Sequence, residues 1–377
     1  MPATWPTPLL QIDGEGRPAA DGWTFPTRDP ATGEVLAHVP DGGAADMDAA
    51  VEAAHKTFHA TVWSDDDRLR WTSLQRLHAL LAQHHGHLRG LMTAETGMPV
   101  SLTPPHLDEP LARMLDVRDR GVVPGVVAVI TPMTSPLSFA LDTIAPVLSA
   151  GGTVVLKPAP DAAWTALELG RIAAQVLPRG VLNVVASRDV DVAIALTTDP
   201  RVDEVFFAGC PVNAERVRVT ATQAGKRVRI DVGGPSAPLR VGPGDDLEAV
   251  VSDAAARVCA HAGQVPRLPA AVVVPAGRYS EAVRVAVRAV SDIKVGDPTD
   301  PATVCGPLVS PVQRDRVLRY LALARSEGGH VETGGLALAR RGGWWVAPTV
   351  VSGLDLGSRV VREEILGPVL LVVSDRS

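Results

Sequence analysis

Short apolar runs alternate with helical patterns along the first part of the chain. Each run has the length of a strand and is largely apolar, as expected for a parallel sheet that helices cover on both faces. The segments between the runs repeat apolar residues every three or four positions, which is typical of helices. The predicted strands are residues 122–130, 153–160, 180–185, 205–207 and 228–230. The alternation predicts an α/β fold with a doubly wound parallel sheet.

The same alternation starts again after residue 234. Helical patterns cover residues 247–262, 281–290 and 311–326, and apolar runs cover residues 270–274, 345–351 and 369–373. We therefore expect two domains, residues 1–232 with a helical N-terminal lead-in and residues 233–377. No helical pattern follows the last run, so we expect its strand to be uncovered and the second domain to be incomplete.

The composition excludes several classes of protein. Hydrophobic residues make up 46% and charged residues 21% of the 377 positions, which is typical of a globular protein rather than a disordered or fibrous one. The formal net charge of −6 argues against a nucleic-acid-binding protein. We find neither an export signal nor an apolar run of membrane-spanning length, so we expect no membrane association.

Cysteines and histidines give no metal motif. The three cysteines are Cys210, Cys259 and Cys305, and their wide spacing matches no metal site and suits the reducing cytoplasm. A cluster of histidines lies on one predicted helix, at His84, His85 and His87. No carboxylate or thiol stands at a matching offset, so we expect a solvated face rather than a metal site.

Residues 205–234 form the most informative stretch of the chain. An apolar strand is followed by Gly209, by Pro211 at a suitable position for a first helical turn, and by a second strand that ends at Asp231. Because ligands bind at the carboxyl ends of strands in such sheets, this unit is a candidate dinucleotide site with an acid. Lys157 stands at the end of another predicted strand, where it could bind a phosphate or a ribose hydroxyl. A capped helix and a solvated lysine are the alternatives.

Several motifs then occur in a fixed order, and together they resemble the aldehyde dehydrogenase superfamily almost from end to end. They are RDPATGEV from Arg28, LKPAP from Leu156, FFAG from Phe206, DVGG from Asp231, AGQV from Ala262, VGDPTDPATVCGPL from Val295 and EEILGPV from Glu363. The resemblance implies two Rossmann-like domains that bind NAD or NADP. It also implies a reaction in which a cysteine thiolate attacks an aldehyde, hydride passes to nicotinamide, and a glutamate activates water to hydrolyse the thioester.

The resemblance implies which residues would hold the cofactor. Lys157 matches the lysine at the adenine ribose and Glu364 the glutamate at the nicotinamide ribose. The other matching positions are the turn glycine Gly209, Cys210 at the serine of the pyrophosphate turn, and Gly233 of the DVGG motif. Family residues are replaced at Ala214, Met133 and Leu366, so we expect weakened binding of NAD or NADP and no metal.

The catalytic positions depart from the family pattern. Pro266 stands where the nucleophilic cysteine is expected, and it has neither a thiol nor a backbone N–H. Thr134 replaces the asparagine that helps to bind the oxyanion, and Asp231 replaces the glutamate base with a side chain shorter by one methylene. We read Cys210 as a small packing residue rather than as a relocated nucleophile.

Two family segments are missing from this sequence. Only a few residues separate the helix near Leu115 from the strand at Val126, where family members carry an oligomerisation hairpin, and the chain ends soon after EEILGPV. We therefore expect a monomer or a non-standard oligomer. An open edge of the second domain is expected to be covered by a partner protein.

Three functional hypotheses follow. The first is a pseudoenzyme, a non-catalytic or partner-binding homologue that has lost thiol-dependent aldehyde oxidation. The second is a repurposed NAD(P)-binding enzyme whose polar groups would include Asp231, Thr134 and His261, although we expect His261 to be an ordinary residue on a helix surface. The third is an aldehyde oxidoreductase completed by a partner chain. The sequence indicates no substrate.

Overall fold

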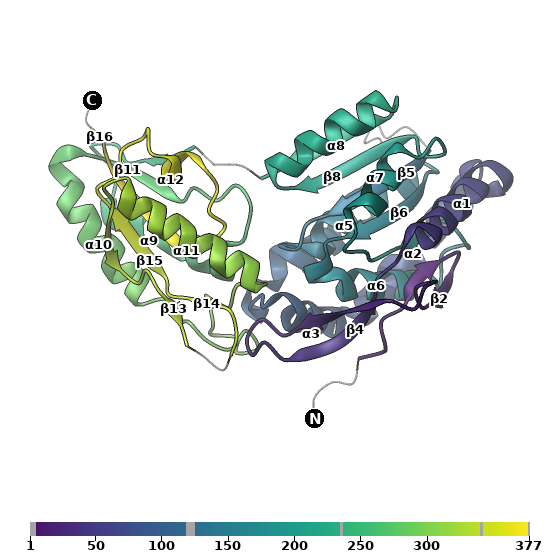
Figure 1. The fold of residues 1–377 in the computed structure, drawn as a ribbon, viewed down its shortest axis with the longest axis horizontal. Coiled ribbons are helices and arrows are strands. Elements are labelled where there is room, and N and C mark those ends of the chain that lie inside the picture. Colours follow the sequence, from purple (N-terminus) through teal and green to yellow (C-terminus); the bar gives the residue numbers. More distant parts are fainter. Residues whose placement is uncertain (1–4, 118–124, 234–236, 340–341, 376–377) are drawn as a thin grey trace. The chain divides into compact units, whose positions relative to one another are not determined.

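The computed structural model describes residues 5–117, 125–233, 237–339 and 342–375 in two compact units (Figure 1). Unit 1 comprises Met1–Arg28, Val35–Glu95 and Thr103–Val232, and unit 2 comprises Asp29–Glu34, Thr96–Leu102 and Gly233–Ser377. The two short N-terminal segments belong to unit 2 because long-range hydrogen bonds hold them there. Trp345 Nε1 donates to Ala31 O at 3.0 Å, and Ser101 Oγ donates to Thr303 O at 2.8 Å.

Unit 1 is built on a sheet of seven strands in the order β2-β1-β7-β6-β5-β8-β9. The five strands from β7 to β9 run parallel, and β1 is antiparallel to both of its neighbours. The strands are β1 Leu10–Ile12, β2 Glu15–Arg17, β5 Val126–Thr131, β6 Thr153–Pro158, β7 Leu182–Val184, β8 Glu204–Gly209 and β9 Arg227–Val232. The parallel α/β sheet expected from the sequence is confirmed, although residues 122–124 of one predicted strand lie outside the described residues.

The helices of unit 1 connect these strands (Figure 1). They are α1 Ala44–Ala60, α2 Asp67–Gln83, α3 His85–Thr96, α4 Glu109–Arg113, α5 Pro136–Ser149, α6 Ala163–Ala173, α7 Val190–Thr198 and α8 Pro211–Gln223. A further antiparallel pair joins β3 Thr24–Arg28 to β4 Val35–Pro40.

The buried carboxylate of Glu95 fixes the start of α6. It accepts hydrogen bonds from the backbone N–H groups of Trp164 and Thr165 at 2.8 and 2.7 Å, and from the Thr165 hydroxyl at 2.6 Å. These donors satisfy N–H groups that a helix leaves open in its first turn. Burial nevertheless dominates and raises the pKa of Glu95 to about 7.

The strand order of unit 1 places a topological switch between β5 and β8. The chain proceeds from β5 through β6 to β7 on one side, and β8 and β9 then add on the other side of β5. In open parallel sheets, ligands bind outside the carboxyl ends of the strands at this point. The segments that follow Thr131 and Gly209 therefore occupy the expected ligand-binding edge of unit 1.

Unit 2 contains a sheet of five strands in the order β10-β11-β16-β15-β12. Its strands are parallel except for β12. The strands are β10 Leu239–Arg240, β11 Ala271–Pro275, β12 His330–Thr333, β15 Thr349–Ser352 and β16 Val369–Asp375. The helices are α9 Leu247–Cys259, α10 Tyr279–Ser291, α11 Pro311–Ser326 and α12 Arg359–Arg362, and a small hairpin joins β13 Ala337–Leu338 to β14 Trp345–Val346.

The last strand, β16, is central to this sheet. It pairs with β11 on one side and β15 on the other, its residues 369–373 are buried, and α9 and α10 pack against it. The expectation of an uncovered last strand is therefore wrong, because helices from earlier in the chain cover it. Whether the second domain is incomplete stays a prediction, as does the missing hairpin, whose position includes residues 118–124 outside the described part.

Exposed large apolar side chains of unit 2 lie on different segments. In the described residues they are Val312, Leu336 and Leu356. Within the described ranges no helix is long and apolar enough to cross a membrane.

Candidate functional site

The predicted residues of unit 1 lie at or just beyond the carboxyl ends of its parallel strands. Lys157 is on β6, Gly209 is the last residue of β8, and Asp231 is near the end of β9. Thr134 lies in the segment between β5 and α5. Because these ends share one edge of the sheet, the topology brings these strand ends to the same side of unit 1.

Lys157 is a buried cation at this edge. Its side chain is only 7% exposed, and its ammonium group donates to Ser187 O at 2.8 Å. Burial lowers the pKa of Lys157 to about 8, while the carboxylates of Asp41 and Asp189 act in the opposite direction. One of three ammonium protons is used by Ser187, which leaves donors for a ribose or phosphate oxygen.

We predict that the Lys157→Met variant is more stable than the parent protein at pH 7. The buried ammonium binds its proton less tightly in the folded chain than in the unfolded chain, so the parent gains stability as the pH rises from about 8 toward 10.5. The shift corresponds to about 3 kcal/mol, of which the lost bond to Ser187 removes about 1 kcal/mol. Urea unfolding of both proteins between pH 7 and 10 measures this difference. An advantage of the variant that grows with pH would contradict the prediction.

The β8–α8 turn supplies backbone donors for an anion. Pro211 occupies the first turn of α8 and has no N–H, so the open donors there are the amides of Val212 and Asn213. Gly209 also has a packing role, because a Cβ at this position would lie 2.7 Å from the Phe207 ring. Helix N-termini of this kind bind phosphates, so the turn fits a pyrophosphate.

Cys210 forms the N-cap of α8 and is exposed, and its side chain makes no capping hydrogen bond. The reading of Cys210 as a packing residue is therefore wrong. The other cysteines are buried, and burial raises the pKa of Cys259 to about 12. Neither Cys259 nor Cys305 has the exposure of a reactive thiol.

Thr134 is the predicted oxyanion donor, and it is 4% exposed. Its hydroxyl makes no hydrogen bond among the described residues. Asp231 is half-buried and pairs in register with Ala208 of β8. A buried hydroxyl without a hydrogen bond costs about 1 to 3 kcal/mol of folding free energy. A ligand that accepted a hydrogen bond from Thr134 would remove this cost.

The loop before Pro266 in unit 2 has an unusual backbone. His261, Ala262 and Gly263 have φ angles of 48°, 52° and 70°, all in the left-handed region. His261 is only 1% exposed, so the expectation of a residue on a helix surface is wrong. Non-glycine residues rarely adopt this conformation, and such strain often marks a functional loop.

Glu364 contacts Arg267, the residue that follows Pro266 at the predicted nucleophile position. Arg267 donates its backbone N–H to Glu364 Oε1 at 3.2 Å, and Arg267 itself has a φ of 62°. Gly233 packs on the same carboxylate, since a Cβ there would lie 2.6 Å from Glu364 Oε2. The structure therefore brings Gly233, Glu364 and the Pro266 loop together.

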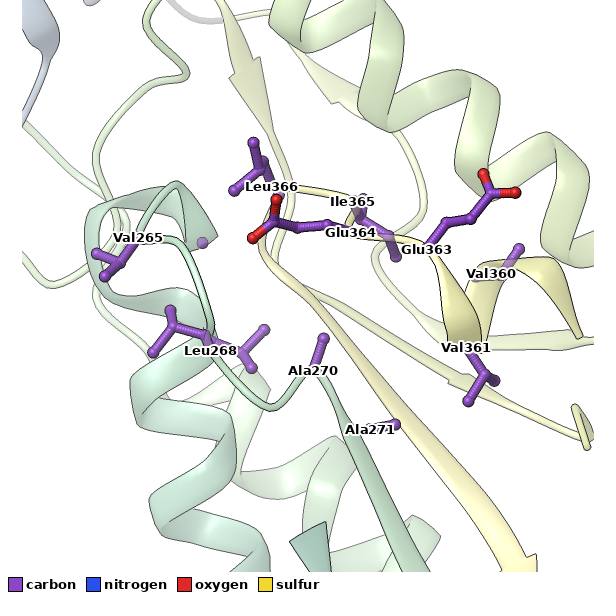
Figure 2. A pocket seen from close by; sticks show the side chains of 13 residues that line it. Val265, Leu268, Ala270, Ala271, Val360, Val361, Glu363, Glu364, Ile365 and Leu366 are labelled. Carbon is purple, nitrogen blue, oxygen red and sulfur yellow. The ribbon is translucent and has the colours of Figure 1, made fainter. Parts of the chain in front are cut away.

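A small cavity of about 30 Å³ lies beside Glu364, with room for about two water molecules (Figure 2). Its walls are mostly apolar and include Val265, Leu268, Ala270, Val361 and Ile365. The Glu364 carboxylate extends toward the Val265 loop, whereas Glu363 points away from it, and Tyr320 donates its hydroxyl to Glu363 at 2.8 Å. A carboxylate rather than a thiol is thus the polar group at this cavity.

Two residues that the sequence analysis missed hold the EEIL segment. Arg316 donates to Glu364 O at 2.5 Å, and Gln313 donates to Leu366 O at 2.6 Å. Both lie on α11, whose helical pattern is visible in the sequence, but no local pattern indicates their long-range partners. They fix the backbone from which Glu364 extends.

The histidines near α3 contact carboxylates individually. His85 lies beside Asp108, and His87 Nε2 lies 2.7 Å from Glu168. The expectation of a purely solvated face is therefore wrong, because Glu168 is buried. The described residues contain no group of three or more ligands that could hold a metal ion.

Comparisons with known proteins agree with this architecture. The family model described as "Aldehyde dehydrogenase family" matches residues 18–116 and 110–376. The chain is 32% identical to the putative aldehyde dehydrogenase DhaS of Bacillus subtilis, over 97% of this chain and 78% of that protein. It is 30% identical to the chloroplastic betaine aldehyde dehydrogenase of Beta vulgaris, over 97% of this chain and 79% of the relative.

Solved structures of the family have the same fold. The P. syringae indole-3-acetaldehyde dehydrogenase AldA, in a complex with NAD⁺ and IAA, gives a TM-score of 0.91 at 31% identity, covering 98% of this chain and 80% of that one. The NAD⁺ complex of a Bacillus cereus aldehyde dehydrogenase gives 0.92 at 28% identity, covering 99% and 80%. The chain belongs to the aldehyde dehydrogenase family.

Proposed function

We propose that this protein is an NAD(P)-binding member of the aldehyde dehydrogenase family that does not carry out thiol-dependent aldehyde oxidation. The observation that carries the proposal is Pro266 at the nucleophile position, in a loop where Glu364 is the polar neighbour. Cys259 and Cys305 are buried, and Cys210 belongs to the other unit. A hemithioacetal at residue 266 cannot form without a thiol. With respect to aldehyde oxidation, the protein then acts as a non-catalytic, partner-binding homologue.

Retained features of unit 1 support nucleotide binding. Lys157 keeps free donors at the end of β6, and the first turn of α8 offers backbone N–H groups. The solved relatives include complexes with NAD⁺. Pro211 provides no N–H donor, and Ala214 leaves less space at the turn than a glycine would. The proposed affinity for the nucleotide is therefore weaker than for a glycine-rich turn.

Calorimetric titration with NAD⁺ and NADP⁺ tests this proposal. We expect saturable binding that Lys157→Ala weakens by roughly 10- to 100-fold, the value of one charge-assisted hydrogen bond. Lys56→Ala is the matched control, because Lys56 is an exposed lysine on α1. With an aldehyde added, we expect no NADH absorbance. Either the absence of binding at millimolar nucleotide or steady NADH formation would overturn the proposal.

A further inference from the structure

A buried serine–histidine pair lies in unit 1, outside the positions that family resemblance singles out. His106 Nδ1 lies 2.7 Å from Ser135 Oγ, although 29 residues separate them in sequence. Ser135 is 5% and His106 6% exposed. A neutral histidine whose Nδ1 carries no proton accepts the serine O–H in this geometry, which is the arrangement of a nucleophile and its base.

Ser135 does not use its hydroxyl as an N-cap residue normally does. It occupies the N-cap of α5, a helix of 14 residues, yet its side chain makes no capping hydrogen bond. A serine in this position usually accepts an N–H of the first turn. Here the hydroxyl contacts His106 instead, and the N–H groups of Leu137 and Ser138 in the first turn have no partner within the helix.

Two further hydroxyls lie on the segment that leads into Ser135. Thr131 and Thr134 are 2% and 4% exposed, and neither hydroxyl makes a hydrogen bond among the described residues. Buried polar groups without partners are uncommon and call for a water molecule or a ligand. Residues 131–135 therefore carry two buried hydroxyl groups without hydrogen bonds, close in sequence to Ser135.

The position in the fold is that of a ligand site. The segment follows the carboxyl end of β5, which lies at the topological switch between β5 and β8. Ligands of open parallel sheets bind at this crevice. Because both side chains are almost fully enclosed, only a small acyl group could reach them.

We propose that Ser135 and His106 form a nucleophile–base pair that hydrolyses small activated carboxylic esters. Ser135 Oγ attacks the carbonyl carbon while its proton moves to His106 Nδ1. The ester C–O bond breaks, the leaving alcohol takes that proton, and an acyl-serine remains. Water then attacks the acyl-serine and gives a proton to His106, which returns it to Ser135 as the carboxylic acid leaves. The N–H groups at the start of α5 and the Thr134 hydroxyl are candidate donors to the oxyanion.

This activity is independent of the proposed nucleotide binding. It requires no oxidant and no cysteine, since an ester and water give an acid and an alcohol. Burial lowers the pKa of His106 to about 4, so the imidazole is neutral at pH 7 and one of its ring nitrogens is a hydrogen-bond acceptor. If the titration shows no nucleotide binding, the proposal of ester hydrolysis is unaffected. If the ester assay fails, the proposal of nucleotide binding is unaffected.

The test uses p-nitrophenyl acetate and a fluorophosphonate probe on the full chain. We expect a burst of p-nitrophenol and a covalent adduct that peptide mass mapping places on Ser135. Ser135→Ala should reduce the burst rate at least a hundredfold. The matched control is Ser149→Ala, which removes a hydroxyl from the last residue of the same helix.

One more variant identifies the base. His106→Gln should slow the burst while circular dichroism shows a folded chain, and the adduct map distinguishes Ser135 from the exposed thiol of Cys210. Even if Ser135→Ala failed to fold, mapping the adduct on the parent protein would decide the outcome. No adduct, or an adduct on Cys210, would overturn the proposal.

Discussion

The Gly263→Ala variant is expected to destabilise unit 2 by about 2 to 5 kcal/mol, the combined cost of a left-handed non-glycine residue and of overpacking. Gly263 has a φ of 70°, and a Cβ at this position would lie 2.1 Å from Gly367 O and 2.8 Å from Val258 O. All the closest atoms belong to the backbone and cannot move aside as a flexible side chain would. The loop that carries Pro266 would have to shift.

Hydrogen exchange of the β16 amides measures this loss within unit 2, and urea unfolding measures it for the chain. The control is Gly277→Ala, since a Cβ there meets no atom within 4 Å. We expect a change of less than about 0.5 kcal/mol for the control, as for most surface substitutions. Equal stability of the two variants would show that the loop does not depend on its backbone contact with Gly367.

Much of the fold could be predicted because the strands of these sheets are continuous apolar runs. The helix at residues 311–326 coincides with α11, and the runs at 153–160 and 369–373 overlap β6 and β16. The three-residue strands β1 and β2 were missed, because a segment that short shows no periodicity. The central place of β16 depends on pairing with β11 and β15, which no local pattern contains.

The candidate site was predictable only where the chain resembles a known family. Lys157, Glu364 and the Pro266 position came from family-like motifs, whereas their contacts with Ser187 and Arg267 come from tertiary structure. The buried, left-handed His261 continued a helical pattern and so looked like a surface residue.

Long-range polar contacts account for the residues that were missed. Ser135 follows Thr134 directly in the sequence, but nothing in the sequence indicates that His106 reaches it. Glu95 similarly caps α6 from a distant helix. A hydrogen bond between residues far apart in sequence leaves no periodic signal, so the polar architecture of such a site needs the structure.

The second large expected effect concerns restoring aldehyde oxidation by substitution. Pro266→Cys alone restores a thiol and a backbone N–H, and we expect it to leave aldehyde oxidation near background. At the predicted oxyanion position, Thr134 still lacks the reach of an asparagine amide, and at the predicted base position, Asp231 lacks one methylene of a glutamate. A lost oxyanion donor costs roughly 10²- to 10³-fold in rate, and a lost general base roughly 10²- to 10⁴-fold.

The triple variant Pro266→Cys, Thr134→Asn, Asp231→Glu should therefore oxidise an aldehyde with NAD⁺ at least about a thousandfold faster than the single variant. Initial rates of NADH formation measure this, and Val265→Cys controls for a thiol one position away. Because Thr134 is buried, its replacement by the larger asparagine is checked by thermal unfolding, and the double variant without it serves if the triple variant is unstable. If the single variant formed NADH at a rate within tenfold of the triple variant, the missing thiol alone would explain the absence of aldehyde oxidation. The substitution at position 266 would then account for the whole loss of aldehyde oxidation. The residues at positions 134 and 231 would need an explanation other than decay of the oxidation mechanism.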